Sequence, residues 1–170
     1  MQKYFSKLKA DLKISFHYRY GEMFSKLNDG EIGKNPYTFT IIRPSAATSM
    51  NWPLNFYYRG DYNRFYSFKL QEASYRFIST FGIVGKTSYF SFELKNSLYE
   101  FGKSTYTNFW FTDFDVKFFI DNDRWDVGMS GKNIFGKEVF VSENIFENGF
   151  YSESTYILPA YLMLYVVYNF

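Results

Sequence analysis

The chain has 170 residues and a formal net charge of +2, and 22 Phe and 17 Tyr help to raise its aromatic share to 25%. A charge so close to neutral, with no basic cluster, excludes the usual electrostatic signature of a nucleic-acid-binding protein. The absence of cysteine excludes disulfides and thiolate metal sites. No apolar run reaches the roughly 18 to 20 residues that a membrane-spanning helix needs.

The N-terminal segment lacks the continuous apolar stretch and the small-residue cleavage site of a secretory signal peptide. Either a signal has been removed and Met1 is an expression start, or the chain is a piece of a longer protein. In both cases residues 1–170 are expected to form a single domain, because this length suits one domain with a sizeable core.

A strict alternation of residue types begins at Leu8 and continues to Tyr20. Every even position in this segment is apolar or aromatic, and every odd position is polar or charged. A helix would spread both sets around its surface, whereas successive residues of a strand point to opposite faces. The pattern therefore predicts a long strand with one apolar and one charged face.

The same period of two recurs along the rest of the chain, and no helical periodicity of three or four turns interrupts it. In the second segment Tyr37, Phe39 and Ile41 share one side. In the last segment the even positions from Ala160 to Phe170 form an unbroken apolar row, and Pro159 argues against a helix there. After the first strand, seven further strands are thus predicted within residues 35–43, 54–65, 73–85, 90–101, 109–120, 124–133 and 156–170.

The links between these strands are predicted to alternate in length. The longer links lie at residues 22–35, 65–72, 102–107 and 136–154, and the others at 44–51, 85–89 and 121–123. Transmembrane barrels show this asymmetry, with long extracellular loops and short periplasmic turns. Both termini are therefore expected on the periplasmic side.

Two architectures fit alternating strands: a soluble sandwich or lipocalin-like barrel, and a transmembrane barrel. The first and last strands exceed the usual five or six residues and approach the roughly 9 to 11 that cross a bilayer. Aromatic residues near strand ends match the interfacial girdles of outer-membrane barrels: Tyr18, Tyr20, Trp52, Trp110, Trp125, Tyr168 and Phe170. The favoured fold class is an all-β, antiparallel transmembrane β-barrel of eight strands, either closed or forming the last strands of a larger barrel.

The last two predicted strands carry the residues of a family resemblance. Gly131 is followed closely by Asn133, Ile134 and Phe135, and the chain ends on the alternating series Leu164, Val166, Tyr168 and Phe170. This arrangement resembles the C-terminal end of TonB-dependent transporters of the Bacteroidota type, over residues 125–170. The plug domain and the energy-coupling box of that family have no counterpart within the 170 residues.

The resemblance implies the C-terminal part of a nutrient transporter in the bacterial outer membrane. Its expected partners are outer-membrane lipid, the rest of the barrel, a surface lipoprotein and an inner-membrane energy-coupling protein. It also implies that the last strand is an assembly signal for the barrel-assembly machinery, carried by Leu162, Leu164, Val166, Tyr168 and Phe170. The alternative is a small, self-contained eight-stranded outer-membrane protein with a structural, adhesive or assembly role.

Residues that could carry enzyme chemistry have simpler interpretations. His17 is the only histidine, which excludes a zinc site of the HExxH type. Asp113 and Asp115 share a strand face with Lys117, so an ion-pair ladder is a better interpretation than a pair of hydrolytic carboxylates.

Two further motifs also fail their chemical tests. The segment with Asp121, Asp123 and Asp126 lacks the glycine and the glutamate of a helical calcium loop, and turn preferences explain its composition. Residues 82–88 have neither the spacing nor the following helix of a phosphate-binding loop. Neither enzyme activity, a metal nor a cofactor is expected.

The charged strand faces are predicted to face the barrel lumen and to form the candidate binding surface. In a closed eight-stranded barrel these side chains would fill the lumen and pair with each other, whereas in a larger barrel they would line a solvated wall facing a plug or substrate. The residues of this surface are Lys13, His17, Arg19, Tyr57, Arg59, Asp61, Arg76, Glu93, Lys95, Asp113, Asp115, Lys117 and Lys132.

Overall fold

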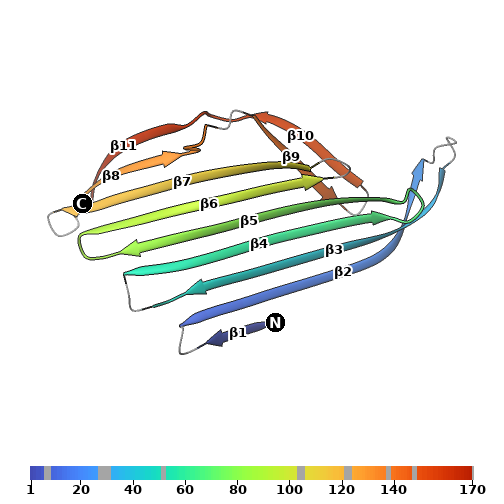
Figure 1. The fold of residues 1–170 in the computed structure, drawn as a ribbon, viewed down its shortest axis with the longest axis horizontal. Coiled ribbons are helices and arrows are strands. Elements are labelled where there is room, and N and C mark those ends of the chain that lie inside the picture. The colour runs from blue at the N-terminus through green and yellow to red at the C-terminus, as the bar shows by residue number, and fades with distance from the viewer. Residues whose placement is uncertain are drawn as a thin grey trace.

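The protein is all-β and antiparallel. A computed structural model of the chain (Figure 1) describes every residue except 6–8, 27–31, 51–52, 103–105, 121–123, 137–138, 147–148 and 170. The described residues contain strands, turns and bends but no helix. Accordingly, no helix long and apolar enough to cross a membrane occurs among them.

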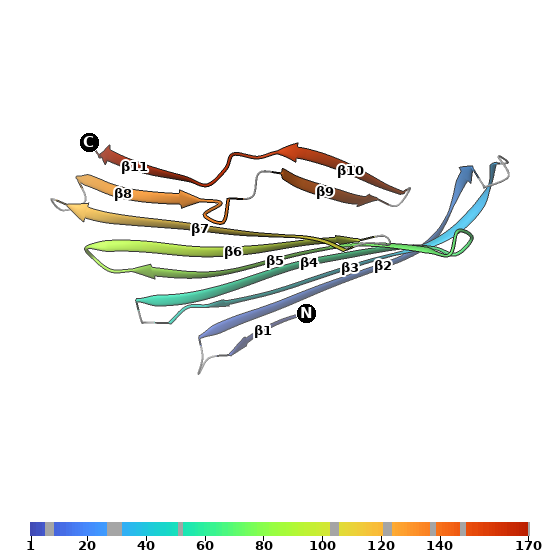
Figure 2. The same ribbon diagram turned by 45° about the horizontal axis from the view of Figure 1, so that its top comes forward.

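Nine strands form one curved sheet, in which every neighbouring pair is antiparallel (Figures 1 and 2). Its order is β1-β2-β3-β4-β5-β6-β7-β8-β11, and β9 and β10 form a separate hairpin. The sheet strands are β1 (Gln2–Phe5), β2 (Ala10–Lys26), β3 (Ile32–Thr48), β4 (Leu54–Ser67), β5 (Glu72–Lys86), β6 (Phe90–Gly102), β7 (Tyr106–Ile120), β8 (Trp125–Lys132) and β11 (Tyr161–Tyr168). The hairpin strands are β9 (Val139–Phe146) and β10 (Gly149–Tyr156).

The sheet is open, with β1 and β11 as its edges. Each predicted segment overlaps one of the strands β2 to β8 or β11, and the short strand β1 adds a ninth. β1 folds back on the beginning of β2, and the amino group of Met1 continues this pairing by donating to the carbonyl of Ile14 at 2.8 Å. The described strands do not close into a barrel.

The links differ from the sequence-based expectation. β2 and β3 pair as far as Lys26 and Ile32, so most of the expected long link at 22–35 is strand. The expected link at 136–154 contains the β9–β10 hairpin. Strand pairing satisfies backbone N–H and C=O groups whatever the side chains are, so the polar composition of these segments concealed their strands. Apart from the segment between β8 and β11, the links are short at both ends of the sheet.

The register divides the sheet into two faces, because directly opposed residues of neighbouring strands point to the same side. We call "apolar face" the side that holds the even-numbered residues of β2, β3, β4, β6, β7 and β11 and the odd-numbered residues of β1, β5 and β8. The remaining positions form the "polar face". The row Phe16, Ile42, Tyr62 and Phe77, opposed in successive strands, illustrates the first side.

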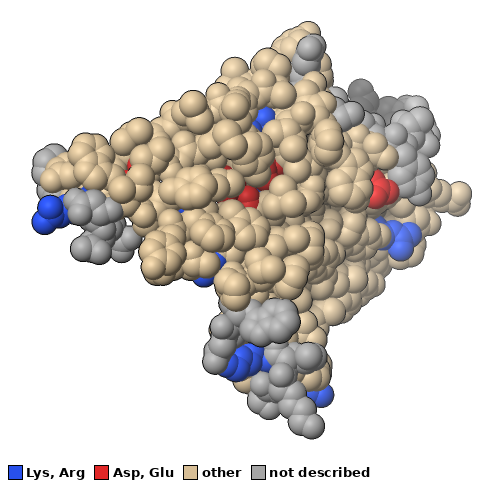
Figure 3. Space-filling view, turned by 60° about the vertical axis from the view of Figure 1, so that its left-hand side comes forward, with Lys and Arg blue, Asp and Glu red and all other residues tan. Residues whose placement is uncertain are grey.

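The apolar face is exposed over much of its area. Leu164 is 76% exposed, Phe16 66% and Val166 63%. Uncharged residues make up most of the surface seen from one end of the sheet (Figure 3). A protein folded in water normally covers so large a set of apolar side chains, so the exposure of this face is unusual for such a protein.

The polar face contains the buried aromatic residues of the fold. Tyr37, Phe39 and Phe65 form a small core there, 4%, 7% and 7% exposed. Tyr37 and Phe39, and with them Ile41, thus lie on the charged side of β2, because Phe39 is opposite Arg19 and Ile41 is opposite His17. Hydropathy marked these residues as one side of their strand, but only the register with β2 decides which face that side joins.

The β9–β10 hairpin covers one end of the polar face. The ring of Phe140 on β9 packs against four aromatic rings, with centroid distances of 5.0 Å to Tyr99, 5.3 Å to Phe109, 5.6 Å to Phe111 and 6.1 Å to Phe101. All four belong to the polar face of β6 and β7. The hairpin is therefore held against the sheet by an aromatic cluster.

We expect Phe140→Ala to loosen the hairpin, because it removes the ring that packs into this cluster. A protease that cuts after glutamate should then cleave at Glu143 and Glu153 several-fold faster, as mass spectrometry of the digest would show. Val139→Ala is the matched control, since adjacent strand residues point to opposite sides. Equal cleavage rates in the two variants would contradict the anchoring role of Phe140.

Candidate functional site

Every candidate residue of the predicted binding surface lies on the polar face. The alternation within each strand placed them correctly relative to their own neighbours, and the register then brings them onto one side. They come from β2 (Lys13, His17, Arg19), β4 (Tyr57, Arg59, Asp61), β5 (Arg76), β6 (Glu93, Lys95), β7 (Asp113, Asp115, Lys117) and β8 (Lys132). That this face binds a ligand or lines a lumen is still a prediction.

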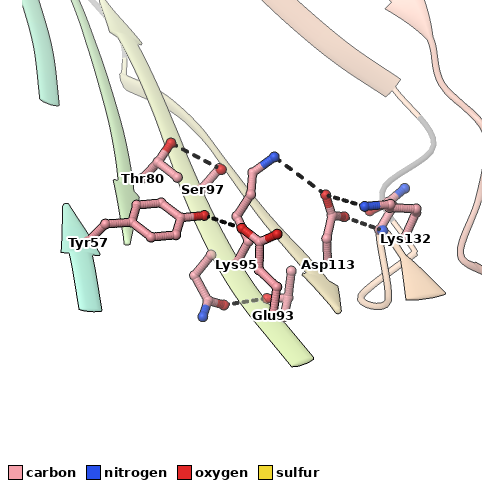
Figure 4. A network of polar contacts seen from close by, with 10 residues as sticks. Tyr57, Thr80, Glu93, Lys95, Ser97, Asp113 and Lys132 are labelled. Atoms are coloured by element: carbon pink, nitrogen blue, oxygen red, sulfur yellow. Dashed lines mark hydrogen bonds and ion pairs between the residues drawn. The ribbon is translucent and has the colours of Figure 1, made fainter. Parts of the chain in front are cut away.

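Asp113 is the centre of an ion-pair cluster on β6, β7 and β8. Lys95 and Lys132 point toward its carboxylate from either side (Figure 4), with N–O distances of 3.7 Å and 3.8 Å. The backbone N–H of Asn133 donates to the same carboxylate at 3.0 Å. Two lysine side chains and one backbone N–H thus contact the Asp113 carboxylate, and these contacts connect β6, β7 and β8.

Asp115 and Lys117 do not extend this cluster as a simple ladder. The Lys117 ammonium lies 3.3 Å from the carboxylate of Asp126 on β8, and Asp115 accepts a hydrogen bond from the hydroxyl of Tyr165 at 3.2 Å. Each of the two carboxylates of the Asp113–Asp115 pair thus has its own partners. This arrangement accounts for both carboxylates without hydrolytic chemistry.

Tyr57 connects two strands that are not neighbours. It lies on β4 directly opposite Gly82 of β5, and its hydroxyl donates to the Glu93 carboxylate on β6 at 2.6 Å. A Cβ atom on Gly82 would come within 2.2 Å of the Tyr57 ring. The ring can cross β5 only because residue 82 has no side chain.

Tyr165 repeats this arrangement on the edge strand β11. It lies on β11 opposite Gly128 of β8, and its hydroxyl reaches Asp115 on β7. A Cβ atom on Gly128 would lie 2.3 Å from the Tyr165 ring. Each tyrosine ring therefore crosses the glycine of the neighbouring strand to reach a carboxylate on the strand beyond it. Each tyrosine thus connects three strands on the polar face.

Further ion pairs lie on β2 to β5. The Asp61 carboxylate lies 3.3 Å from Nε of Arg43 and 3.9 Å from the Arg76 guanidinium, and Asp11 lies 3.4 Å from the Lys13 ammonium. Alternation alone does not single out Arg43, because it shares the side of Phe39 and Ile41 in its strand. The register of β2 and β3, which puts Arg43 opposite Ser15, is the signal that reveals it.

The residues of the family resemblance have defined local roles. Gly131 is opposite Phe114, whose ring would lie 2.2 Å from a Cβ atom at that position. Asn133 follows the end of β8 with a φ of 49°, and its side-chain amide donates to the carbonyl of Leu158 at 3.0 Å. This amide ties the end of β8 to the segment that enters β11. Asparagine is among the residues that adopt such a backbone conformation most readily.

Four residues of the predicted assembly signal lie on the exposed apolar face: Leu162, Leu164, Val166 and Tyr168. Tyr168 packs against Trp125 of β8, with their ring centroids 4.6 Å apart. Phe170 lies outside the described residues, as do Asp121 and Asp123. Within the described part of the chain, no group of three or more histidine, aspartate or glutamate side chains could hold a metal ion.

Comparison of the chain with protein families, curated proteins and solved structures found no match. The grounds for a function are therefore the division between the two faces of the sheet and the resemblance of residues 125–170.

We expect Gly82→Ala to destabilise the protein by about 1–3 kcal/mol, the usual cost of overpacking, because its Cβ would collide with the Tyr57 ring. Chemical unfolding in detergent micelles, followed by tryptophan fluorescence, would measure this change. In a Tyr57→Ala background the same Gly82→Ala substitution should cost little, since the colliding ring is gone. An equal cost in both backgrounds would show that the ring does not define this contact.

Proposed function

We propose that the chain is part of a transmembrane β-barrel in the bacterial outer membrane, with the apolar face toward lipid. The observation that carries this proposal is the exposure of the apolar face, with all the candidate charged residues on the opposite face. Lipid is the medium that such a face fits, because apolar side chains need no protein partner there. Lipid cannot satisfy the open edges of a sheet, so β1 and β11 must find further strand partners in the membrane.

Strand parity favours a barrel with more strands than this sheet contains. β1 and β11 occupy the first and ninth places in an antiparallel sheet, so they run in the same direction. Direct closure between them would be parallel, whereas outer-membrane barrels are antiparallel. Closure of β11 onto β2 would require the edge at Ala10–Lys13, which β1 already occupies. A larger barrel avoids both difficulties.

Within this class we propose the C-terminal part of a TonB-dependent nutrient transporter, on the resemblance of Gly131–Phe135 and the last strand. The polar face would line the solvated interior along which substrate passes. Transport would be powered from the inner membrane and assisted by a surface lipoprotein. The beginning of β2 and the end of β11 lie at the same end of the sheet (Figure 1), which we propose to be periplasmic.

The second candidate is a small outer-membrane barrel with a structural, adhesive or assembly role. The cross-strand ion pairs around Asp113 favour this candidate, because paired side chains fill the narrow lumen of a small barrel. The gene upstream of the Met1 codon separates the two candidates. An in-frame plug domain and further strands would support the transporter, and a signal peptide directly upstream would support the small barrel.

Leu164→Arg tests the orientation of the sheet in the membrane. Leu164 lies in the middle of β11 on the apolar face. If this position meets the bilayer midplane, arginine there should lower the free energy of unfolding by about 2–4 kcal/mol. Met163→Arg is the matched control, since Met163 lies on the polar face opposite Ser130. Heat-modifiable gel mobility and urea unfolding in lipid vesicles would measure both variants.

If Met163→Arg lowers the free energy of unfolding as much as Leu164→Arg does, the assignment of the two faces of β11 to lipid and interior is wrong. A small cost for both variants would remove the membrane proposal itself, because neither face would then meet lipid.

A further inference from the structure

A cavity of about 530 Å³ lies against β2, β3 and β4, away from the clusters around Asp113 and Asp115. Three cationic side chains line it, one from each strand: Lys13, Arg43 and Arg59. Two hydroxyl groups, from Ser15 and Ser45, lie among them. All five residues belong to the polar face. Cations from separate strands around one cavity are the arrangement that binds a multiply charged anion.

The register sets the spacing of these cations. Lys13, Ser45 and Arg59 are opposed in successive strands, so the backbone of Lys13 lies about 10 Å from that of Arg59, at about 4.8 Å per strand. Arg43 is opposite Ser15, two residues along from this row, or about 7 Å away. Long side chains can converge from such positions on a ligand with two or more anionic groups.

The carboxylates nearby leave these cations available. Arg43 pairs with Asp61 and Lys13 with Asp11, but the side chains of both cations are 54% exposed. Such pairs are screened by water and exchange readily for other anions. The Arg59 guanidinium lies 5.8 Å from the centre of the Tyr57 ring and takes part in no ion pair within the residues described.

The cavity coincides with an interruption between β3 and β4. Ile14 exchanges both backbone hydrogen bonds with Met1, so the opposite residue Pro44 directs its backbone toward β4. Proline has no N–H to donate to Gly60, and the β3–β4 pairing is indeed broken between Ile42 and Ser45. Within sheets proline is confined to edges, strand starts and bulges, so Pro44 marks a local break of the ladder where the cavity lies.

The two halves of the polar face also differ in charge balance. On β6 to β8, lysines and carboxylates are closely matched (Lys95, Lys117 and Lys132 with Glu93, Asp113, Asp115 and Asp126). On β2 to β5, cations are in excess (Lys13, Arg19, Arg43, Arg59, Arg76 and Lys86 with Asp11, Asp61 and Glu72). Three of these six cations, Lys13, Arg43 and Arg59, line the cavity.

We propose that the polar face of β2, β3 and β4 binds a ligand that carries at least two carboxylate or phosphate groups, with Arg43 and Arg59 as its main contacts. This inference names the substrate class of the interior surface and so rests on the proposed function. Arginine suits this role because its planar guanidinium can donate two parallel hydrogen bonds to a carboxylate or phosphate.

Isothermal titration of the full chain, refolded in detergent micelles, would test the site. Citrate and inorganic pyrophosphate are the two probes, which distinguish polycarboxylates from phosphates, and sucrose is the neutral control. The double variant Arg43→Gln with Arg59→Gln should weaken binding at least tenfold. Arg64→Gln with Lys69→Gln removes the same charge from the apolar face and a link, and it should leave binding unchanged.

Failure of both probes to bind the unaltered protein would overturn the inference, and so would an equal loss in the control variant. Gel mobility checks folding, and Arg59→Gln alone replaces the double variant if that does not fold. If Leu164→Arg destabilises the protein more than Met163→Arg does, and neither probe binds, this site is rejected but the barrel is kept. Binding by a chain that fails the comparison would keep the site and reject the transporter.

Discussion

The alternation of side chains across a pleated sheet is the constraint on which the rest of the structure depends. Because each strand sends successive residues to opposite sides, a register fixed at one pair fixes the face of every other residue. Along β2 to β8 and β11 this register collects the candidate charged residues on one side and leaves Phe16, Leu164 and Val166 exposed on the other. A shift of one residue in any of the strands β2 to β8 would place charge among the apolar side chains, so the two faces stabilise a single register.

Contacts between glycine and aromatic rings turn the aromatic-rich composition into close strand packing. Six glycines within the strands lie directly opposite an aromatic residue whose ring covers the place of the missing side chain. The pairs are Gly21–Tyr37, Gly82–Tyr57, Gly85–Phe92, Gly102–Tyr75, Gly128–Tyr165 and Gly131–Phe114. They occur on both faces, so they are a property of the sheet rather than of either medium. Covering a glycine in this way offsets the packing that a strand loses where a side chain is missing.

The sequence predicts the strands of this fold better than it predicts their partners. Period-two alternation located β2 to β8 and β11 and sorted most of their residues correctly into two sets, because that pattern is local. It could not assign Phe39 to the polar face or select Arg43, since both depend on the register with β2. It also missed β1, which is too short for a pattern, and the β9–β10 hairpin, whose pairing depends on backbone hydrogen bonds. The candidate site was predicted residue by residue, but its division into a matched half and a cationic half required the sheet order.

These two halves suggest different mechanical roles for one surface. On β6 to β8 and β11, ion pairs at Asp113 and the hydroxyl of Tyr165 tie neighbouring and non-neighbouring strands together, and the hairpin packs beside them through Phe140. The charged side chains there already form ion pairs with one another, so a ligand would have to displace an existing contact. On β2 to β4, Arg43 and Lys13 are half exposed, and the Pro44 interruption loosens the ladder beneath them. In the proposed barrel, the first half would keep the wall rigid while the second exchanges its weak ion pairs for those of a passing anion.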